Sequence, residues 1–168
     1  MNAEEIKSLL KLWPLTFEGG YYSETYRSAD VIAPEGLGGR YGGAPRCAGT
    51  AIYYLLEPGE FSEMHRVASD EIFHFYLGDA VEMLQLWPDG TARLVVIGSE
   101  IGRGMQPQVV VPRGVWQGAR LIEGGRFALL GCTVSPGFEY VDYDSGEREK
   151  LSEAYPEHRE RIAAMTRK

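Results

Sequence analysis

Cysteine is scarce in this sequence, with only Cys47 and Cys132 among 168 residues. Two cysteines provide neither a disulfide framework nor a paired metal-binding spacing, so we expect both to be small buried side chains. The sequence also lacks an apolar run near the roughly 20 residues of a membrane span, and its N-terminus lacks a signal-peptide pattern. We therefore expect no membrane association and a cytoplasmic location.

Positive charge is also in short supply, because 17 Lys and Arg residues face 24 Asp and Glu residues, for a net charge of −7. A nucleic-acid-binding protein needs basic surface to displace the counterions of phosphates. The charge balance therefore predicts no nucleic-acid partner.

Glycine and tyrosine are plentiful, with 21 and 10 residues, and turn-forming residues separate a series of short apolar segments. We predict strands at 19–28, 51–56, 63–67, 71–77, 81–87, 92–98, 107–112 and 127–134, with a flexible Gly/Pro-rich loop at 33–46. Such even spacing favours an antiparallel sandwich or barrel over alternating strands and helices. A chain of this length fits a single domain over 1–168.

Short helices are predicted at both ends. Asn2 and Glu5 form a capping pattern ahead of Ile6, Leu9 and Leu10 at helical spacing, with Pro14 as the stop. A second helix is predicted over 155–165, with Pro156 in its first turn.

The most informative pattern runs from Gly59 to Gly78, with His65 and Glu71 at fixed offsets between them. It resembles the first signature of the cupin superfamily, with Val67 in place of a second histidine. Downstream, Pro112, Gly114 and Gln117 resemble the second signature, with Gln117 in place of its histidine.

Side chains alternate across a strand, so His65 and Val67 share one face, and the turn at 68–70 lets Glu71 return toward the same interior. By the same alternation Phe73 and Phe75 are predicted to follow Glu71 inward. One pocket is therefore expected to collect these residues, and His74 is expected on the opposite face.

A tightly bound divalent metal is not expected, because a metal site needs three or four ligands. If a metal were bound, its ligands would be His65, Glu71 and Gln117. Without a metal, His65 is either a hydrogen-bonded pocket histidine or a general acid or base, the usual role of a side chain that titrates near neutrality.

The segment EGGYYSETYRS at 18–28 resembles an early strand of the sugar-nucleotide epimerases within the cupins, with Glu18, Gly20, Tyr22 and Glu24 at matching positions. The resemblance implies a metal-free pocket with a catalytic histidine, lined by Tyr22 and Glu24 on a strand that crosses to a partner subunit in a homodimer. Gly19 stands where those enzymes carry a phosphate-binding arginine.

Over roughly residues 5 to 160 the chain most resembles the small fifth cupin family. The matching segments are EGGYYSETYRS, HRVASDEIFHFYLGD, VVPRGVWQ and GCTVSPGFEYVDY. The resemblance implies an all-β fold, a cupin double-stranded β-helix or jelly-roll barrel, usually dimeric, with a polar and aromatic pocket.

Three further features are candidates for the pocket. Trp116 offers a flat surface for stacking, and Arg113 could pair with a carboxylate or phosphate. The segment 136–143 either caps the pocket or packs on the barrel end, and packing is the preferred interpretation.

Three hypotheses follow for function. The first is a metal-independent isomerase or epimerase acting on a carbohydrate-like or carbonyl compound, with His65 as base or acid and Glu71 or Glu24 orienting it. The second is a small-molecule-binding protein without chemistry, and the third is a metal-dependent cupin enzyme.

Overall fold

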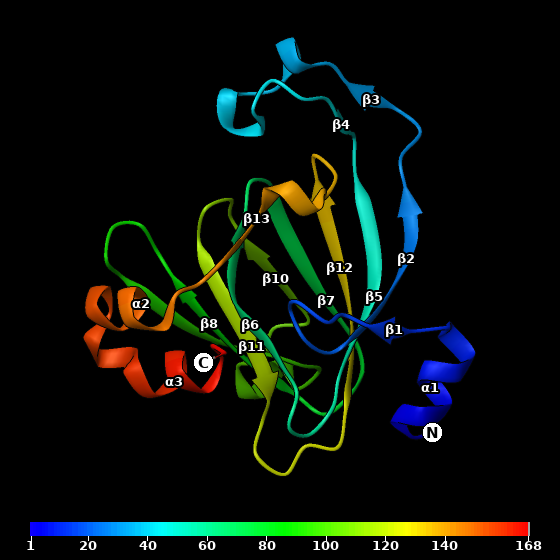
Figure 1. Ribbon diagram of the computed structural model, residues 1–168. Coiled ribbons are helices and arrows are strands. Elements are labelled where there is room, and N and C mark those ends of the chain that lie inside the picture. The colour runs from blue at the N-terminus through cyan, green and yellow to red at the C-terminus, as the bar shows by residue number, and fades with distance from the viewer. Residues whose placement is uncertain (168) are drawn as a thin grey trace.

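Two antiparallel β-sheets face each other in this computed structural model, which describes residues 1–167 (Figure 1). The first sheet has the order β1 (Trp13–Pro14), β2 (Tyr21–Arg27), β5 (Thr50–Leu56), β12 (Ala128–Ser135), β7 (Asp70–Gly78) and β10 (Gln108–Val111). The second has the order β13 (Tyr143–Ser145), β6 (Phe61–Val67), β11 (Trp116–Leu121), β8 (Val81–Leu86) and β9 (Ala92–Ile97). This architecture confirms the predicted all-β jelly-roll barrel.

The core lies between the two sheets and follows the alternation of side chains along each strand. On β7, for example, Phe73 is buried in the main apolar cluster, whereas Ile72 and His74 on either side are only partly buried. The cluster fills the middle of the barrel with residues such as Leu56, Met83 and Leu130. The buried polar side chains of His65, Ser69 and Glu71 lie outside this cluster, at the end of the barrel where β6 turns into β7.

The strand β11 was not predicted, because its sequence WQGARL mixes large, small and charged residues. It nevertheless lies in the middle of the second sheet, paired with both β6 and β8. Its register sets Gln117 opposite His65 on β6 and opposite Gln85 on β8. This pairing brings residues of the two sequence signatures together.

Helices cover the outer faces of the sheets (Figure 1). Helix α1 (Ala3–Leu10) begins at the predicted capping box and ends at Lys11, which adopts a left-handed conformation (φ 54°), so the helix stops before Pro14. The helix predicted over 155–165 is instead the 3-10 turn Pro156–His158 followed by α3 (Arg159–Ala164), and α2 (Arg148–Ala154), which was not predicted, precedes them. None of the helices in residues 1–167 has the length and apolar content to span a membrane.

The segment 33–46, predicted as a flexible loop, contains the 3-10 turns Pro34–Gly36 and Gly39–Tyr41. The short strands β3 (Val31–Ile32) and β4 (Arg46–Cys47) pair with each other where the loop begins and ends. It extends beyond the barrel (Figure 1). Arg46 anchors it through a buried ion pair with Asp142, with Nη2 2.6 Å from Oδ1. This pair joins the hairpin to the 3-10 turn Tyr140–Asp142, which lies over the barrel end.

Candidate functional site

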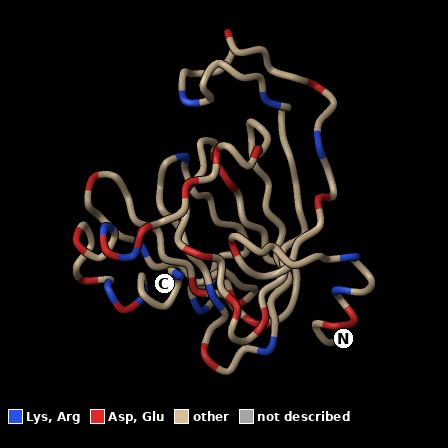
Figure 2. Tube along the Cα trace, in the orientation of Figure 1, with Lys and Arg blue, Asp and Glu red and all other residues tan. Residues whose placement is uncertain are grey.

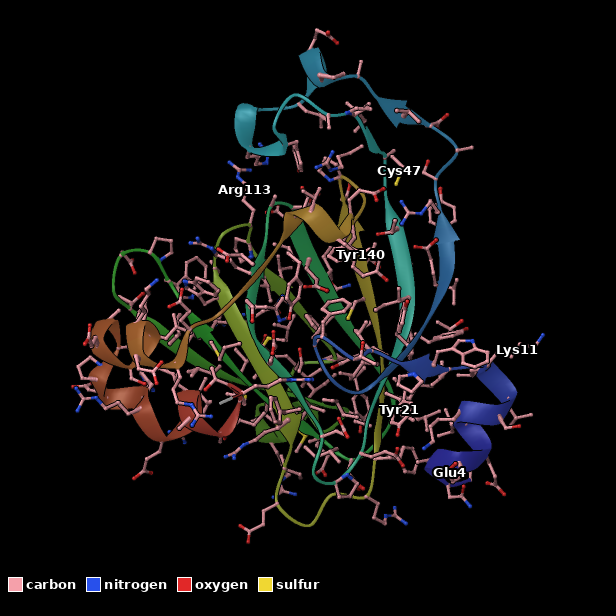
Figure 3. All side chains as sticks on the ribbon, viewed as in Figure 1. Glu4, Lys11, Tyr21, Cys47, Arg113 and Tyr140 are labelled. Atoms are coloured by element: carbon pink, nitrogen blue, oxygen red, sulfur yellow. The ribbon has the colours of Figure 1, made fainter. Side chains whose placement is uncertain are left out.

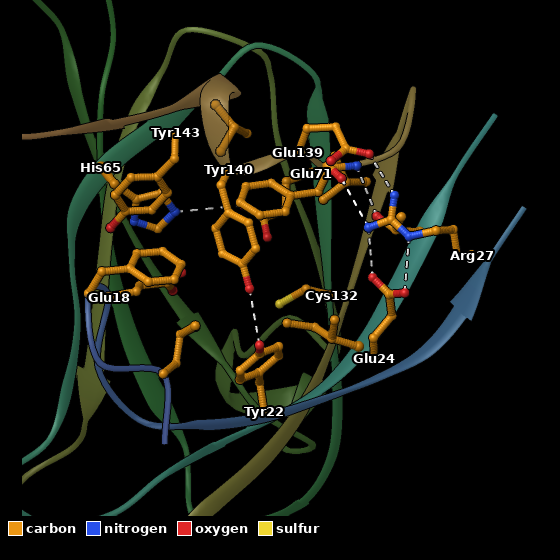
Figure 4. A pocket seen from close by; sticks show the side chains of 17 residues that line it. Glu18, Tyr22, Glu24, Arg27, His65, Glu71, Cys132, Glu139, Tyr140 and Tyr143 are labelled. Carbon is orange, nitrogen blue, oxygen red and sulfur yellow. Dashed lines mark hydrogen bonds and ion pairs between the residues drawn. The ribbon is translucent and has the colours of Figure 1, made fainter. Parts of the chain in front are cut away.

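A cavity of about 80 Å³ opens at this end of the barrel (Figure 4). Its walls come from β2, β5, β6, β7 and β12, and from the segment 138–143. About 10–15 Å³ of such space is enough to admit a single water, so this cavity suits a compact molecule rather than a whole nucleotide sugar.

His65 lies on β6 and is 2% exposed. Its Nδ1 is 2.7 Å from the carbonyl oxygen of Glu63. A carbonyl can only accept a hydrogen bond, so Nδ1 carries a proton, and Nε2 is the ring nitrogen that is left to accept or donate in the site. The ring also stacks on Tyr143, with centroids 4.8 Å apart and an interplanar angle of 15°. Both contacts fix the imidazole with Nε2 4.0 Å from Oε2 of Glu71.

Glu71 begins the inward face of β7 and is 8% exposed. Burial is the main cause that raises the pKa of its carboxyl from an ordinary 4.5 to about 7, and the charge of Glu18 acts in the same direction. The neighbouring His65 and a hydrogen bond from Gln117 oppose this shift. Near neutral pH the carboxyl is therefore populated in both its protonated and its ionised form.

Gln117 connects these two groups from β11 and is 1% exposed. Its Nε2 amide donates to Oε2 of Glu71 and lies 3.3 Å from Nε2 of His65, which accepts. Its Oε1 is buried without a hydrogen-bond partner among residues 1–167. The amide thus holds the imidazole and the carboxyl at a common point.

The cavity rim joins β2 to the segment 138–143 (Figure 4). Arg27 donates to both carboxylate oxygens of Glu24 at 3.1 and 2.9 Å, and to Oε1 of Glu139 at 2.8 Å. The hydroxyls of Tyr22 and Tyr140 hydrogen-bond to each other at 3.1 Å. This bond, with burial, raises the pKa of Tyr140 to about 12. The segment therefore caps the cavity, which corrects the preferred interpretation that it only packs on the barrel end.

Of the predicted site residues, His65, Glu71, Glu24 and Tyr22 lie in the cavity wall, and Gln117 lies behind His65 and Glu71. Phe73 and Phe75 do point inward, but they pack in the apolar core beneath the cavity and do not line it. Each step along β7 carries the side chain about 3.3 Å further from the barrel end, so they lie too deep.

The other two predicted residues lie away from the cavity. Trp116 immediately precedes Gln117 on β11, and neighbours on a strand face opposite sides. Its ring packs in the outer cluster beneath α2 and α3, and the guanidinium of Arg66 lies 4.4 Å from the ring centroid. Arg113 is exposed on the loop between β10 and β11, outside the cavity (Figure 3).

Several wall residues were not predicted, among them Phe17, Arg27, Cys132 and Tyr143. Strict alternation would put Arg27 and Glu24 on opposite faces of β2. A register shift between Glu24 and Tyr26 brings both to the same side. The sequence carries no clear sign of that bulge, whereas the aromatic content of 136–143 was a usable signal for Tyr140 and Tyr143.

The donor set does not fit the metal that many cupins carry. Val67 has no donor atom where a second histidine would stand, and the amide of Gln117 turns its NH₂ group toward His65 and Glu71. Among the described residues, no group of three or more His, Cys, Asp or Glu side chains could hold a metal ion. One imidazole and one carboxylate fall short of the usual ligand count, so these residues do not fit a resident divalent metal.

A protein-family sequence model described as cupin superfamily (DUF985) matches residues 4–145. The chain belongs to this family. This cupin is 29% identical to a Saccharomyces cerevisiae protein described as uncharacterized, over 95% of this chain and 85% of the yeast protein.

Solved structures of similar proteins agree with this assignment. A hypothetical protein from Leishmania major matches the cupin with a TM-score of 0.89 and 33% identity, over 100% of both chains. A Shewanella oneidensis protein gives 0.86 and 32%, over 99% of this chain and 98% of the other. Oxalate decarboxylase from Bacillus subtilis gives 0.52 and 14%, over 88% of this chain and 35% of that one, and shows the shared fold alone.

Proposed function

We propose that this cupin binds a compact carbohydrate-like or carbonyl compound and isomerises or epimerises it by proton transfer, without a metal. The observation that carries the proposal is the approach of His65 Nε2 to within 4.0 Å of Glu71 Oε2 in the wall of one cavity. General acid–base catalysis needs a base and an acid that both reach the substrate and titrate near the working pH.

In the proposed reaction, Nε2 of His65 removes a proton from the carbon beside the carbonyl group. The protonated form of Glu71 donates its proton to the carbonyl oxygen, which gives an enediol. The protonated His65 then gives its proton to the neighbouring carbon while the ionised Glu71 takes the proton of the other hydroxyl, which completes an isomerisation. If the proton returns instead to the opposite face of the first carbon and Glu71 recovers the proton that it donated, the result is an epimerisation. The reaction is redox-neutral and both residues end in their starting states.

The pKa of Glu71, about 7, supports this assignment, because an acid with such a pKa keeps a donating fraction at neutral pH. Gln117 orients both reacting groups through its amide and must release both atoms before protons are transferred. We treat Gln117 as a positioning residue.

The test is solvent-deuterium incorporation into a panel of small aldoses, ketoses and aminated carbonyl compounds, followed by NMR. We expect wild-type protein to label at least one compound, and His65→Gln to slow labelling at least about a hundredfold, the range of a lost general base. His74→Gln is the matched control, because His74 lies outside the cavity wall and contacts Thr133 at 3.2 Å. Labelling by His65→Gln at the wild-type rate would reject the proposal.

Binding without chemistry is the second candidate, and the hydrogen bonds of Gln117 favour it. In the described conformation its amide occupies both atoms that would transfer protons. A pure binding protein would gain melting temperature with ligand by mass action. It would incorporate no deuterium into that ligand.

A further inference from the structure

The charged groups of the cavity wall are unbalanced. The carboxylates of Glu18, Glu24 and Glu139 face one guanidinium, that of Arg27. Three negative charges against one positive charge leave −2, and Glu71 makes this −3 when it ionises. Basic residues elsewhere are spread along the chain instead of gathering on this rim (Figure 2).

The single guanidinium is already neutralised. Arg27 binds Glu24 through two hydrogen bonds and Glu139 through a third, and a fourth goes to the carbonyl oxygen of Phe138 at 3.3 Å. A carboxylate or phosphate ligand would have to displace one of these carboxylates. The rim therefore offers no free positive group to an anion.

Glu18 lies further in and makes no ion pair among residues 1–167. Its Oε1 accepts a hydrogen bond from Ser62 at 2.6 Å. Its negative charge contributes to the raised pKa values of Glu71, Tyr143 and Cys132. Three groups on different strands thus experience the same negative potential in the cavity.

Aromatic rings form another part of the wall. Phe17 meets Tyr140 and Tyr143 edge to face, with centroids 5.3 and 5.0 Å apart, and Phe138 meets Tyr140 in the same way at 5.4 Å. Together with Tyr22, these four rings line the same cavity. Electron-rich faces attract organic cations, and quaternary ammonium groups are the ligands that such aromatic cages bind.

We infer that the cavity selects a compact organic cation, an alkylammonium or quaternary ammonium compound. The aromatic rings contact its alkyl groups, and Glu18 compensates its charge. The inference rests on the proposed function only in placing the ligand in this cavity. If that function holds, the substrate is a small carbonyl compound that also carries a protonated amine.

Three probes of similar shape and different charge test the charge preference in the wild-type protein. They are choline, its uncharged analogue 3,3-dimethylbutan-1-ol and the anion 3,3-dimethylbutanoate, each titrated by calorimetry. We expect choline to bind about tenfold more tightly than the alcohol and the anion to bind more weakly still. Equal affinities, tighter binding of the anion, or no choline binding at millimolar concentration would overturn the inference.

Glu18→Gln removes the unpaired charge with little change in shape, and it should weaken choline binding several-fold while leaving the alcohol unchanged. Glu100→Gln is the matched control, since Glu100 is exposed and pairs with Arg103 at 2.9 Å, away from the cavity. In the wild-type protein, choline binding without deuterium labelling of any compound rejects the proposed function alone, whereas labelling without choline binding rejects the cation inference alone.

Discussion

The carboxyl of Glu71 carries a free-energy cost that depends on pH. Its pKa is about 7 in the folded protein against an ordinary 4.5, so the folded state holds the proton over a range where the unfolded chain has lost it. The free energy of unfolding is therefore highest below about pH 4.5, where the carboxyl is protonated in both states, and it falls as the pH rises through about 7. Above that range the loss stays constant, on the order of 3 kcal/mol.

We predict that Glu71→Gln removes this pH dependence. Relative to wild type, the free energy of unfolding of the variant should rise between about pH 4.5 and 7, because the amide never ionises. Urea denaturation at a series of pH values measures it, with Glu100→Gln as the control. A difference between Glu71→Gln and wild type that stays constant with pH would contradict the assigned burial of charge.

A second prediction concerns Gly19, which has a φ of 109° in the turn before β2. A methyl group there would meet the carbonyl oxygen of Phe61, and few side chains adopt such a backbone conformation. Gly19→Ala should therefore lose about 1–3 kcal/mol of stability. Gly39→Ala is the control, because nothing lies near its added methyl group. Equal melting temperatures for the two variants would show that the turn can relax.

At the scale of elements, the segment 138–143 depends on one buried ion pair. Arg46 and Asp142 are 3% and 5% exposed, whereas Arg66 and Asp144 form a similar contact at 44% and 52% exposure. We predict that Asp142→Asn costs about 3–5 kcal/mol, because it leaves a buried guanidinium uncompensated. Asp144→Asn should cost less than about 1 kcal/mol. Chemical denaturation compares them, and similar costs for both would refute the anchoring role of Arg46.

Strand spacing and the two signatures were enough to predict the barrel and the meeting of His65 with Glu71. Both depend on local alternation, which the sequence records directly. The strand β11 was not predicted because its sequence does not alternate between apolar and polar residues. Its position is decided by pairing with β6 and β8. A tertiary contact of this kind overrides local preference.

The rest of the site could not be predicted for related reasons. The bulge that turns Arg27 toward Glu24 is a property of the pairing between β2 and β5. The depth of Phe73 and Phe75 depends on where the barrel core begins. The position of Trp116, in contrast, could have been predicted. Gln117 was expected in the pocket, so alternation places the neighbouring Trp116 on the outer face of the sheet.

For the whole molecule, the resemblance to the epimerases predicts a homodimer that shares β2. One edge of β2 pairs with β5, and the other pairs with β1 only at Tyr21 and Tyr22 among the described residues. The open part of that edge is available to a second chain. Light scattering should give twice the chain mass of 18.7 kDa. Monomer alone at low micromolar concentration would reject the dimer.

The rim described above closes the cavity through residues more than a hundred positions apart, since Arg27 and Tyr22 on β2 contact Glu139 and Tyr140. The Arg27–Glu139 pair is about half exposed, at 40% and 44%, so dissolved ions screen it, whereas the tyrosine pair carries no charge. Ionic strength therefore acts on how long a captured molecule stays. Salt should shorten the residence time of a bound molecule because it weakens the Arg27–Glu139 pair but not the tyrosine pair. Stopped-flow measurement of the dissociation rate should show a rise with potassium chloride concentration in wild type and no rise in Arg27→Gln.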